Sequence, residues 1–214
     1  MLAAGSAYAQ SANDQPEAAP FGEAFDLTPP ASVPSPETVD TPDISEAPSP
    51  APQDRAARLD ELFTQLKRTA DTDEAQALAV QIQAEWMAAE SDTTALLMRW
   101  SSDAIGREDR AAALDLLDQI VLLDPGYAEG WNRRATLNYE MSRYGQSLAD
   151  IEQTLAREPR HFGALMGLAT MLEMFDRKAE AIEVYQRVLD VYPALEGAQE
   201  AIGRLAEETS GQPS

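Results

Sequence analysis

Residues 128–161 read AEGWNRRATLNYEMSRYGQSLADIEQTLAREPRH, and residues 162–195 read FGALMGLATMLEMFDRKAEAIEVYQRVLDVYPAL. Each stretch is 34 residues long and has a proline at its position 32, namely Pro159 and Pro193. The 34 residues before them have Pro125 at the same position. A fixed period of this size indicates an architecture of repeated units.

The pattern inside each unit predicts two helices. Apolar residues fall at positions 4, 7 and 8 and again at positions 20, 21, 24, 27 and 28, which is the spacing of one face of an α-helix. Small residues at positions 8 and 20 allow two antiparallel helices to approach closely. Turn-permissive residues separate the two stretches, as in 106–109, 142–145 and 176–177. Each unit is therefore predicted to be a helix–turn–helix hairpin.

The three units resemble the tetratricopeptide repeat (TPR), which has large residues at positions 4 and 7, small ones at 8 and 20, and proline at 32. The resemblance implies an all-α fold, a right-handed α-solenoid of helix–turn–helix units. It also implies core positions for Trp86, Trp100 and Trp131. Four residues depart from the pattern, namely Ser101, Arg134, Ser147 and Thr154.

The same register divides the rest of the chain. We expect residues 94–127, 128–161 and 162–195 to be three TPR units, and residues 196–208 to be a C-terminal capping helix. The pattern continues weakly upstream, so residues 54–93 are predicted to be a degenerate first hairpin, since terminal units of solenoids are atypical. The residues that continue the pattern there are Phe63, Leu66, Ala79, Val80, Trp86 and Met87.

The N-terminal part has a different composition. Ala7-Tyr8-Ala9 fits a signal-peptidase site, so residues 1–12 are interpreted as the remnant of a clipped signal peptide and the protein as periplasmic or secreted. The alternative is an ordinary alanine-rich N-terminus of a cytoplasmic protein. Residues 13–53 are rich in proline and acids and lack Lys and Arg, which predicts a disordered tail. Its apolar segment 21–27 is a spacer or a docking motif. Architecture and export signal together resemble small repeat proteins of Gram-negative bacteria.

Charge and composition exclude several classes of protein. The formal net charge is −21, with 37 acidic and 16 basic residues in 214. Contacts to nucleic-acid phosphates need clustered Lys and Arg, so no nucleic-acid partner is expected. No apolar run approaches the length of a membrane-spanning helix, so direct membrane insertion is not expected either. The absence of cysteine excludes disulfides, thiolate metal sites and cysteine nucleophiles.

The residues that could support catalysis are few. His161 is the sole histidine, and it is interpreted as a surface or loop residue that touches the next helix. The acidic cluster of Asp71, Asp73 and Glu74 lacks the glycine and the distal glutamate of a calcium loop, and the helix dipole explains its charge. We therefore predict no catalytic, metal or cofactor-binding residue. A hydrolase with an unrecognised site is the less favoured interpretation.

A binding groove follows from the resemblance, because the first helices of TPR units line a concave face. The residues predicted to line it are Met98, Arg99, Ser102, Ile105, Asn132, Arg133, Thr136, Tyr139, Met166, Thr170, Glu173 and Met174. Co-chaperone members hold a C-terminal carboxylate with a clamp of Lys, Asn and Arg. The corresponding positions here are Met98, Ser102, Arg133, Gly163 and Gly167, so four of five do not match.

Two arginines in this groove leave two hypotheses open. Arg99 and Arg133 occupy the same position of successive units, where they could bind an acidic feature of a peptide. Alternatively they pair with groove acids such as Glu129 and Glu140. The function predicted from the sequence is a non-catalytic scaffold that binds a partner protein segment. The alternative is a self-associating structural component of an envelope assembly, and the sequence leaves the oligomeric state open.

Overall fold

The computed structural model describes residues 52–210, and within this range the chain forms nine α-helices and no strand. The predicted signal remnant and residues 13–51 of the predicted tail, including the apolar segment 21–27, lie outside the described residues. The helices are α1 Pro52–Arg68, α2 Thr72–Met87, α3 Asp92–Gly106, α4 Arg110–Leu123, α5 Ala128–Glu140, α6 Tyr144–Arg157, α7 Phe162–Met174, α8 Lys178–Val191 and α9 Glu196–Ser210.

The turns inside the hairpins repeat with the 34-residue period. Glu108, Ser142 and Asp176 each adopt a left-handed backbone, with φ of 60°, 59° and 59°. The residue after each one donates a backbone hydrogen bond to the carbonyl five residues back, for example from Arg143 to Asn138 at 2.8 Å. This arrangement closes the C-terminus of a helix by a Schellman-type turn. The repeat therefore extends to backbone conformation.

The recurring prolines occupy a second repeated turn, between the hairpins. The residue before each proline accepts a hydrogen bond from the amide three residues later, as from Tyr127 to Asp124 at 3.1 Å and from His161 to Glu158 at 3.1 Å. Proline is favoured at the second position of such a turn because its φ is already fixed there. These prolines therefore both end the second helices and shape the links to the next hairpins.

Small side chains at the two predicted close-approach positions are buried in all three repeat units. The six residues are Ser101, Ala113, Ala135, Ser147, Ala169 and Ala181. The hydroxyl of Ser147 donates to the Ala135 carbonyl at 2.8 Å, so this serine is satisfied inside the interface between α5 and α6. A serine can therefore replace the usual small apolar residue here without leaving a buried polar group unpaired.

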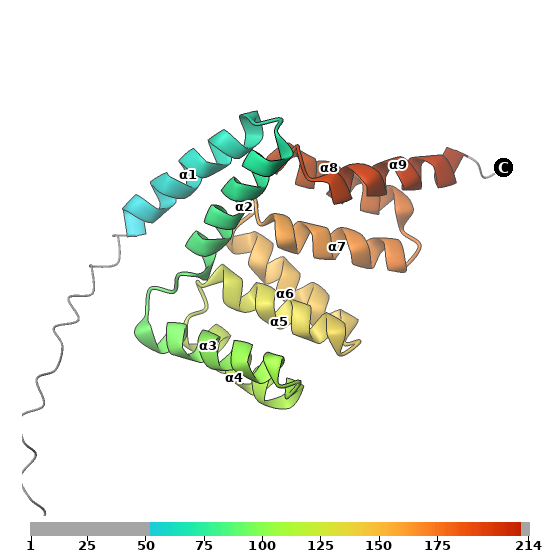
Figure 1. Cartoon of the computed structure of the whole chain (residues 1–214). Coiled ribbons are helices and arrows are strands. Elements are labelled where there is room, and N and C mark those ends of the chain that lie inside the picture. Colours follow the sequence, from blue (N-terminus) through green and yellow to red (C-terminus); the bar gives the residue numbers. More distant parts are fainter. Residues whose placement is uncertain (1–51, 211–214) are drawn as a thin grey trace, which may run out of the picture. The chain divides into compact units, whose positions relative to one another are not determined.

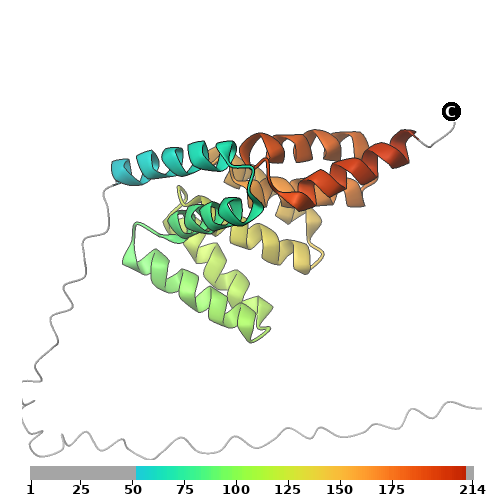
Figure 2. The same cartoon turned by 45° about the horizontal axis from the view of Figure 1, so that its top comes forward.

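Each hairpin from α3 to α8 packs on the helix that follows it, and α9 packs on α8 (Figure 1). The hairpin α1–α2 has another place. Although it precedes α3–α4 in the sequence, α1 packs on α8 and α2 on α5, and both views show it across the ends of the later helices (Figure 2). The weak continuation of the sequence pattern therefore does not indicate stacking before α3.

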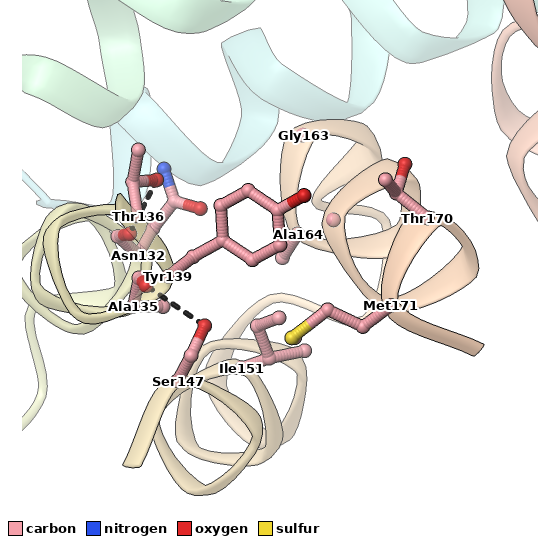
Figure 3. A pocket seen from close by; sticks show the side chains of 11 residues that line it. Asn132, Ala135, Thr136, Tyr139, Ser147, Ile151, Gly163, Ala164, Thr170 and Met171 are labelled. Atoms are coloured by element: carbon pink, nitrogen blue, oxygen red, sulfur yellow. Dashed lines mark hydrogen bonds between the residues drawn. The ribbon is translucent and has the colours of Figure 1, made fainter. Parts of the chain in front are cut away.

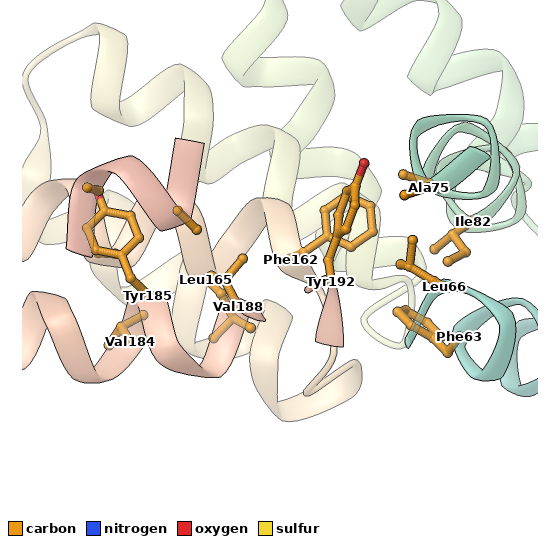
Figure 4. Packing of buried hydrophobic residues seen from close by; sticks show 14 of the residues in the cluster. Phe63, Leu66, Ala75, Ile82, Phe162, Leu165, Val184, Tyr185, Val188 and Tyr192 are labelled. Carbon is orange, nitrogen blue, oxygen red and sulfur yellow. The ribbon is translucent and has the colours of Figure 1, made fainter. Parts of the chain in front are cut away.

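Aromatic side chains fix the hairpin α1–α2 in this place (Figure 4). Phe63 and Trp86 belong to the same buried cluster as Phe162, at the start of α7, and Tyr192, just after α8. The ring centroids of Trp86 and Phe162 lie 4.9 Å apart, and those of Phe162 and Tyr192 lie 5.6 Å apart. An ion pair between Arg160 and Asp60, with Nη1 to Oδ1 at 2.7 Å, supports the contact from the surface.

The three tryptophans, all expected in the core, have different environments. Trp86 is buried, but Trp100 is 47% exposed because α1–α2 packs elsewhere and does not cover α3. Trp131 is partly exposed, and the guanidinium groups of Arg134 and Arg157 lie over its ring, at 4.9 and 4.8 Å from the ring centroid. The core prediction is thus wrong for Trp100. Two residues of the weak upstream pattern, Val80 and Met87, are exposed as well.

Candidate functional site

The predicted groove residues on α5 and α7 meet around a pocket of about 190 Å³ that also reaches α6 (Figure 3). Four of them line it, namely Asn132, Thr136, Tyr139 and Thr170. The remaining lining residues are Ala135, Ser147, Ile151, Gly163, Ala164, Gly167 and Met171. We call this cavity the α5–α7 pocket.

The floor of the α5–α7 pocket comes from the hydrophobic core. Ala135, Ile151, Ala164 and Met171 form one buried cluster. Ile151 is at position 24 of its repeat unit, so the repeat pattern predicts it as a core residue and does not connect it with the binding face. The two glycines at mismatched clamp positions, Gly163 and Gly167, could have indicated the pocket, because residues four apart in a helix share a face and these two add no side chain.

The other predicted groove residues are placed around this pocket or away from it. Met98 is buried in the core between α3, α4 and α5, so it cannot line a surface groove, and this corrects the prediction. Ser102, Ile105 and Met166 are partly buried, whereas Arg99 and Met174 are exposed. Glu173 pairs with Arg204 of α9, with Oε1 and Nη2 2.7 Å apart.

Arg133 is held by contacts within the protein. Its Nε lies 3.1 Å from Glu129 Oε1, its Nη1 donates to Ser102 Oγ at 3.2 Å, and its Nη2 lies 3.0 Å from Met87 Sδ. These contacts favour pairing with a groove acid over recognition of an acidic peptide by this side chain. Arg99 is exposed on α3. It lines neither the α5–α7 pocket nor a neighbouring pocket between α2 and α5.

His161 lies at the centre of a buried cluster with Trp86, Glu129 and Arg133, which we call the His161 cluster. The imidazole is 2% exposed, which corrects the surface interpretation, and it stacks on the indole of Trp86 with centroids 4.0 Å apart and planes at 10°. Its Nδ1 accepts from the Ala164 amide at 3.1 Å and so caps α7. The hydrogen is therefore on Nε2, which donates to Glu129 Oε2 at 3.2 Å.

The electrostatics of the His161 cluster depend on Glu129. Burial of this carboxyl group acts to raise its pKa, but the hydrogen bond and electrostatic attraction from His161, and then those from Arg133, outweigh burial and lower it. Glu129 is therefore an ionised, paired group. Both ring nitrogens of His161 are hydrogen-bonded within the protein, so neither is left unpaired.

A buried ion pair explains one departure from the repeat pattern. Arg134, at a position that is usually apolar, makes two bonds to Asp150, Nε to Oδ2 at 3.0 Å and Nη2 to Oδ1 at 2.6 Å. Asn138 donates to the same carboxylate at 3.1 Å. These bonds to Asp150 are the largest of the causes that raise the pKa of Arg134. Removal of Arg134 would leave the buried Asp150 carboxylate without an opposite charge, whereas Arg134 has a second partner in the exposed Asp118, with Nη1 to Oδ1 at 2.8 Å.

The acidic cluster at the start of α2 has a structural use. Asp71 accepts a hydrogen bond from the Glu74 amide at 2.8 Å and caps that helix. Within residues 52–210, no group of three or more His, Cys, Asp or Glu side chains could hold a metal ion. None of the helices in this range has the length and apolar character needed to cross a membrane.

Comparison with known proteins assigns the family. A family model described as tetratricopeptide repeat matches residues 132–196. A TPR repeat-containing protein of Rhizobium etli is 48% identical over 154 residues, which cover 72% of this chain and 76% of that protein. The chain belongs to the tetratricopeptide repeat family. Proteins built from TPR units are typically scaffolds for protein–protein interaction.

Solved structures of TPR domains share the fold at low sequence identity. The Arabidopsis OM64 TPR domain has a TM-score of 0.51 at 18% identity, covering 55% of this TPR protein and 97% of that chain. The first TPR domain of Spaghetti (RPAP3), bound to an HSP90 peptide, has a TM-score of 0.53 at 15% identity, covering 57% and 100%. MamA has a TM-score of 0.51 at 16% identity, covering 74% and 84%.

Proposed function

We propose that this TPR protein is a non-catalytic scaffold that binds a segment of a partner protein across α5 and α7. The observation that carries the proposal is the α5–α7 pocket, which opens where four predicted groove residues meet. Support comes from the Spaghetti (RPAP3) domain, which has the same fold and is bound to a peptide. The partner here need not end in a carboxylate, because the clamp positions Gly163 and Gly167 have no side chains.

The binding face extends beyond the α5–α7 pocket toward α2. A neighbouring pocket of about 280 Å³ shares Asn132 and Gly163 with it and is also lined by Gln83 and Met87 of α2. Met87 is exposed and has a flexible side chain that suits contacts with varied partners. The hairpin α1–α2 thus adds a wall to the face that the three repeat units form.

The test is a comparison of two double variants in affinity capture from an extract of the source organism. Thr136→Glu with Thr170→Glu changes two exposed residues that line the pocket on α5 and α7, whereas Thr64→Glu with Thr93→Glu makes the same chemical change at exposed positions of α1 and α3. We expect the groove variant to lose a captured partner that the wild type and the control variant both retain. Equal retention by all three proteins would refute binding on this face.

Location is the second part of the proposal. We place the protein in the periplasm or outside the cell, on the small-x-small sequence Ala7-Tyr8-Ala9 that precedes an acidic, proline-rich segment. Cells of the source organism can be fractionated and the protein detected in each fraction with an antibody to residues 52–210, which tests this location. Recovery of a full-length chain with its first residues from the cytoplasmic fraction would refute export.

One observation favours self-association as a second candidate function. The hairpin α3–α4 is not covered by α1–α2, and it exposes Trp100, Leu122 and Leu123. Exposed apolar side chains of this size on one hairpin are typical of an interaction surface. Light scattering at increasing protein concentration tests the idea. We expect Leu122→Glu with Leu123→Glu to leave a monomer if the wild type associates, and a wild-type monomer at all concentrations would refute it.

A further inference from the structure

The α5–α7 pocket has an uncharged lining in a strongly acidic protein. The chain has a formal net charge of −21, yet none of the eleven residues that line the pocket is charged. A charged group placed there would lose its hydration without gaining a partner of opposite charge from the lining, which is costly. The pocket therefore selects against carboxylate and ammonium groups.

Four of the five polar side chains of the lining, all but Tyr139, are already hydrogen-bonded within the protein. Thr136 Oγ1 donates to the Asn132 carbonyl at 3.1 Å, Thr170 Oγ1 to the Met166 carbonyl at 2.9 Å, and Ser147 Oγ to the Ala135 carbonyl at 2.8 Å. The Asn132 amide donates to Glu129 at 3.1 Å. With these donors in use, recognition in the pocket rests mainly on shape and apolar contact.

The size of the pocket suits one large side chain. An apolar protein cavity of about 150 Å³ is large enough to bind benzene, and this pocket has about 190 Å³. In Figure 3 the ring of Tyr139 extends from α5 toward α7, and Met171 and Ile151 face the same space from below. A phenyl or isobutyl group would be enclosed by aromatic, thioether and branched aliphatic surfaces.

Two glycines leave this space open at a cost to the helix. Gly163 and Gly167 lie one turn apart in α7 and both line the pocket. A glycine inside a helix costs about 1 kcal/mol relative to alanine. A Cβ on Gly167 would lie 3.6 Å from Ile151 Cδ1, which is ordinary contact, so a larger side chain at this position would grow into the pocket without a backbone clash.

We infer that the α5–α7 pocket is the anchor site for one large, uncharged apolar side chain, of the phenylalanine or leucine kind, on the partner segment. This inference rests on the proposed function and specifies the partner's chemistry. The partner is recognised by an apolar residue inserted between α5 and α7 beside Tyr139, with flanking contacts to the surface of α2.

Two small probes test the inference directly. N-acetyl-phenylalaninamide should shift the methyl NMR signals of Met171 and Ile151 saturably, whereas N-acetyl-aspartic acid amide should not. Gly167→Leu fills the pocket and should abolish these shifts. Gly203→Leu is the matched control and should leave them unchanged, because Gly203 lies in α9 and a Cβ added there would meet no atom within 4 Å. Equal shifts with both probes, or shifts that survive Gly167→Leu, would overturn the inference.

The captured partner separates the anchor from the proposed function. We expect Gly167→Leu to weaken partner binding at least tenfold and Gly203→Leu to leave it within twofold of wild type. If Gly167→Leu binds the partner normally while Thr136→Glu with Thr170→Glu does not, the anchor inference is wrong and the proposed function stands. If neither change affects binding, the proposed function itself fails.

Discussion

Replacement of Trp86 by alanine tests the unexpected place of the hairpin α1–α2. Trp86 is 8% exposed and contacts Phe63, His161 and Phe162, and the last two lie in the loop before α7 and at its start. Trp100 is the matched control, since the repeat register assigns it to the core but it is 47% exposed. The same substitution at both positions therefore compares the observed packing with stacking in sequence order.

The expected magnitudes follow from burial. An aromatic side chain buries about 150–250 Å², and at about 25 cal/mol per Å² a fully buried tryptophan contributes about 4–6 kcal/mol. Trp86→Ala also leaves a cavity, and such changes typically lower the free energy of unfolding by about 3–5 kcal/mol. Trp100→Ala leaves no enclosed cavity and removes about half as much burial, so we expect a loss of about 2–3 kcal/mol.

Urea unfolding followed by circular dichroism measures both variants. Amide hydrogen exchange then locates the effect of Trp86→Ala, which should raise exchange in α1 and α2 more than in α5 and α6. If Trp100→Ala costs as much as Trp86→Ala, or if α3 rather than α1 loses protection in the Trp86 variant, the hairpin α1–α2 packs on α3–α4 in solution and its observed place is refuted.

Three other positions have stability effects that differ in sign or in pH dependence. Gly130→Ala should lower the melting temperature, with a loss of about 1–3 kcal/mol, because its Cβ would lie 2.7 Å from Ile120 Cγ2; an unchanged melt would contradict this packing. Ser142→Gly should raise stability by about 0.5–1 kcal/mol in the same assay, since φ is 59° there. Glu129→Gln should cost about 1.5–3 kcal/mol at pH 7. Because the folded-state pKa of Glu129 is lowered, its contribution is present above the unfolded value of about 4.3 and lost as pH falls through the folded value, so a pH-independent difference in urea unfolding would refute the pairing.

The helices from α3 to α9 could be predicted from the sequence because their packing is local. Each repeat unit contacts mainly its neighbours, so the same small and apolar residues recur at the same positions, and the period itself identifies the fold. The left-handed residues show the limit of this reasoning. Glu108, Ser142 and Asp176 have dissimilar side chains, so their residue types do not predict that they share a left-handed backbone conformation.

The place of α1–α2 could not be predicted for the same physical reason. An apolar face read from the sequence shows that a helix packs, but not on which surface. Phe63 and Trp86 fit the weak repeat pattern, and yet their partners are Phe162 and Tyr192, about a hundred residues away. The burial of His161 depends on this contact, which is why the surface interpretation failed, although His161 does lie in the loop before α7 and caps that helix.

The residues at the rim of the binding face could be predicted from the sequence, but those at the floor of its pocket could not. Asn132, Thr136, Tyr139 and Thr170 follow from positions on the first helix of each unit, and they do meet around one pocket. Its floor uses Ile151 of a second helix and Met171 on the inner side of α7. In the sequence, residues at such positions cannot be distinguished from ordinary core residues. A pocket forms where side chains leave the space between helices unfilled, and the repeat pattern does not show this.

The contact between α1–α2 and α7–α8 has a consequence for the order of folding. A chain of stacked units folds through neighbours in sequence, so each hairpin can be completed as soon as the next is synthesised. Here the hairpin α1–α2 leaves the ribosome before α7 and α8 exist, and the ion pair of Asp60 with Arg160 spans a hundred residues. Loop closure of this length slows folding, so we expect the hairpin α1–α2 to dock after α7 and α8 have formed, although it is made before them.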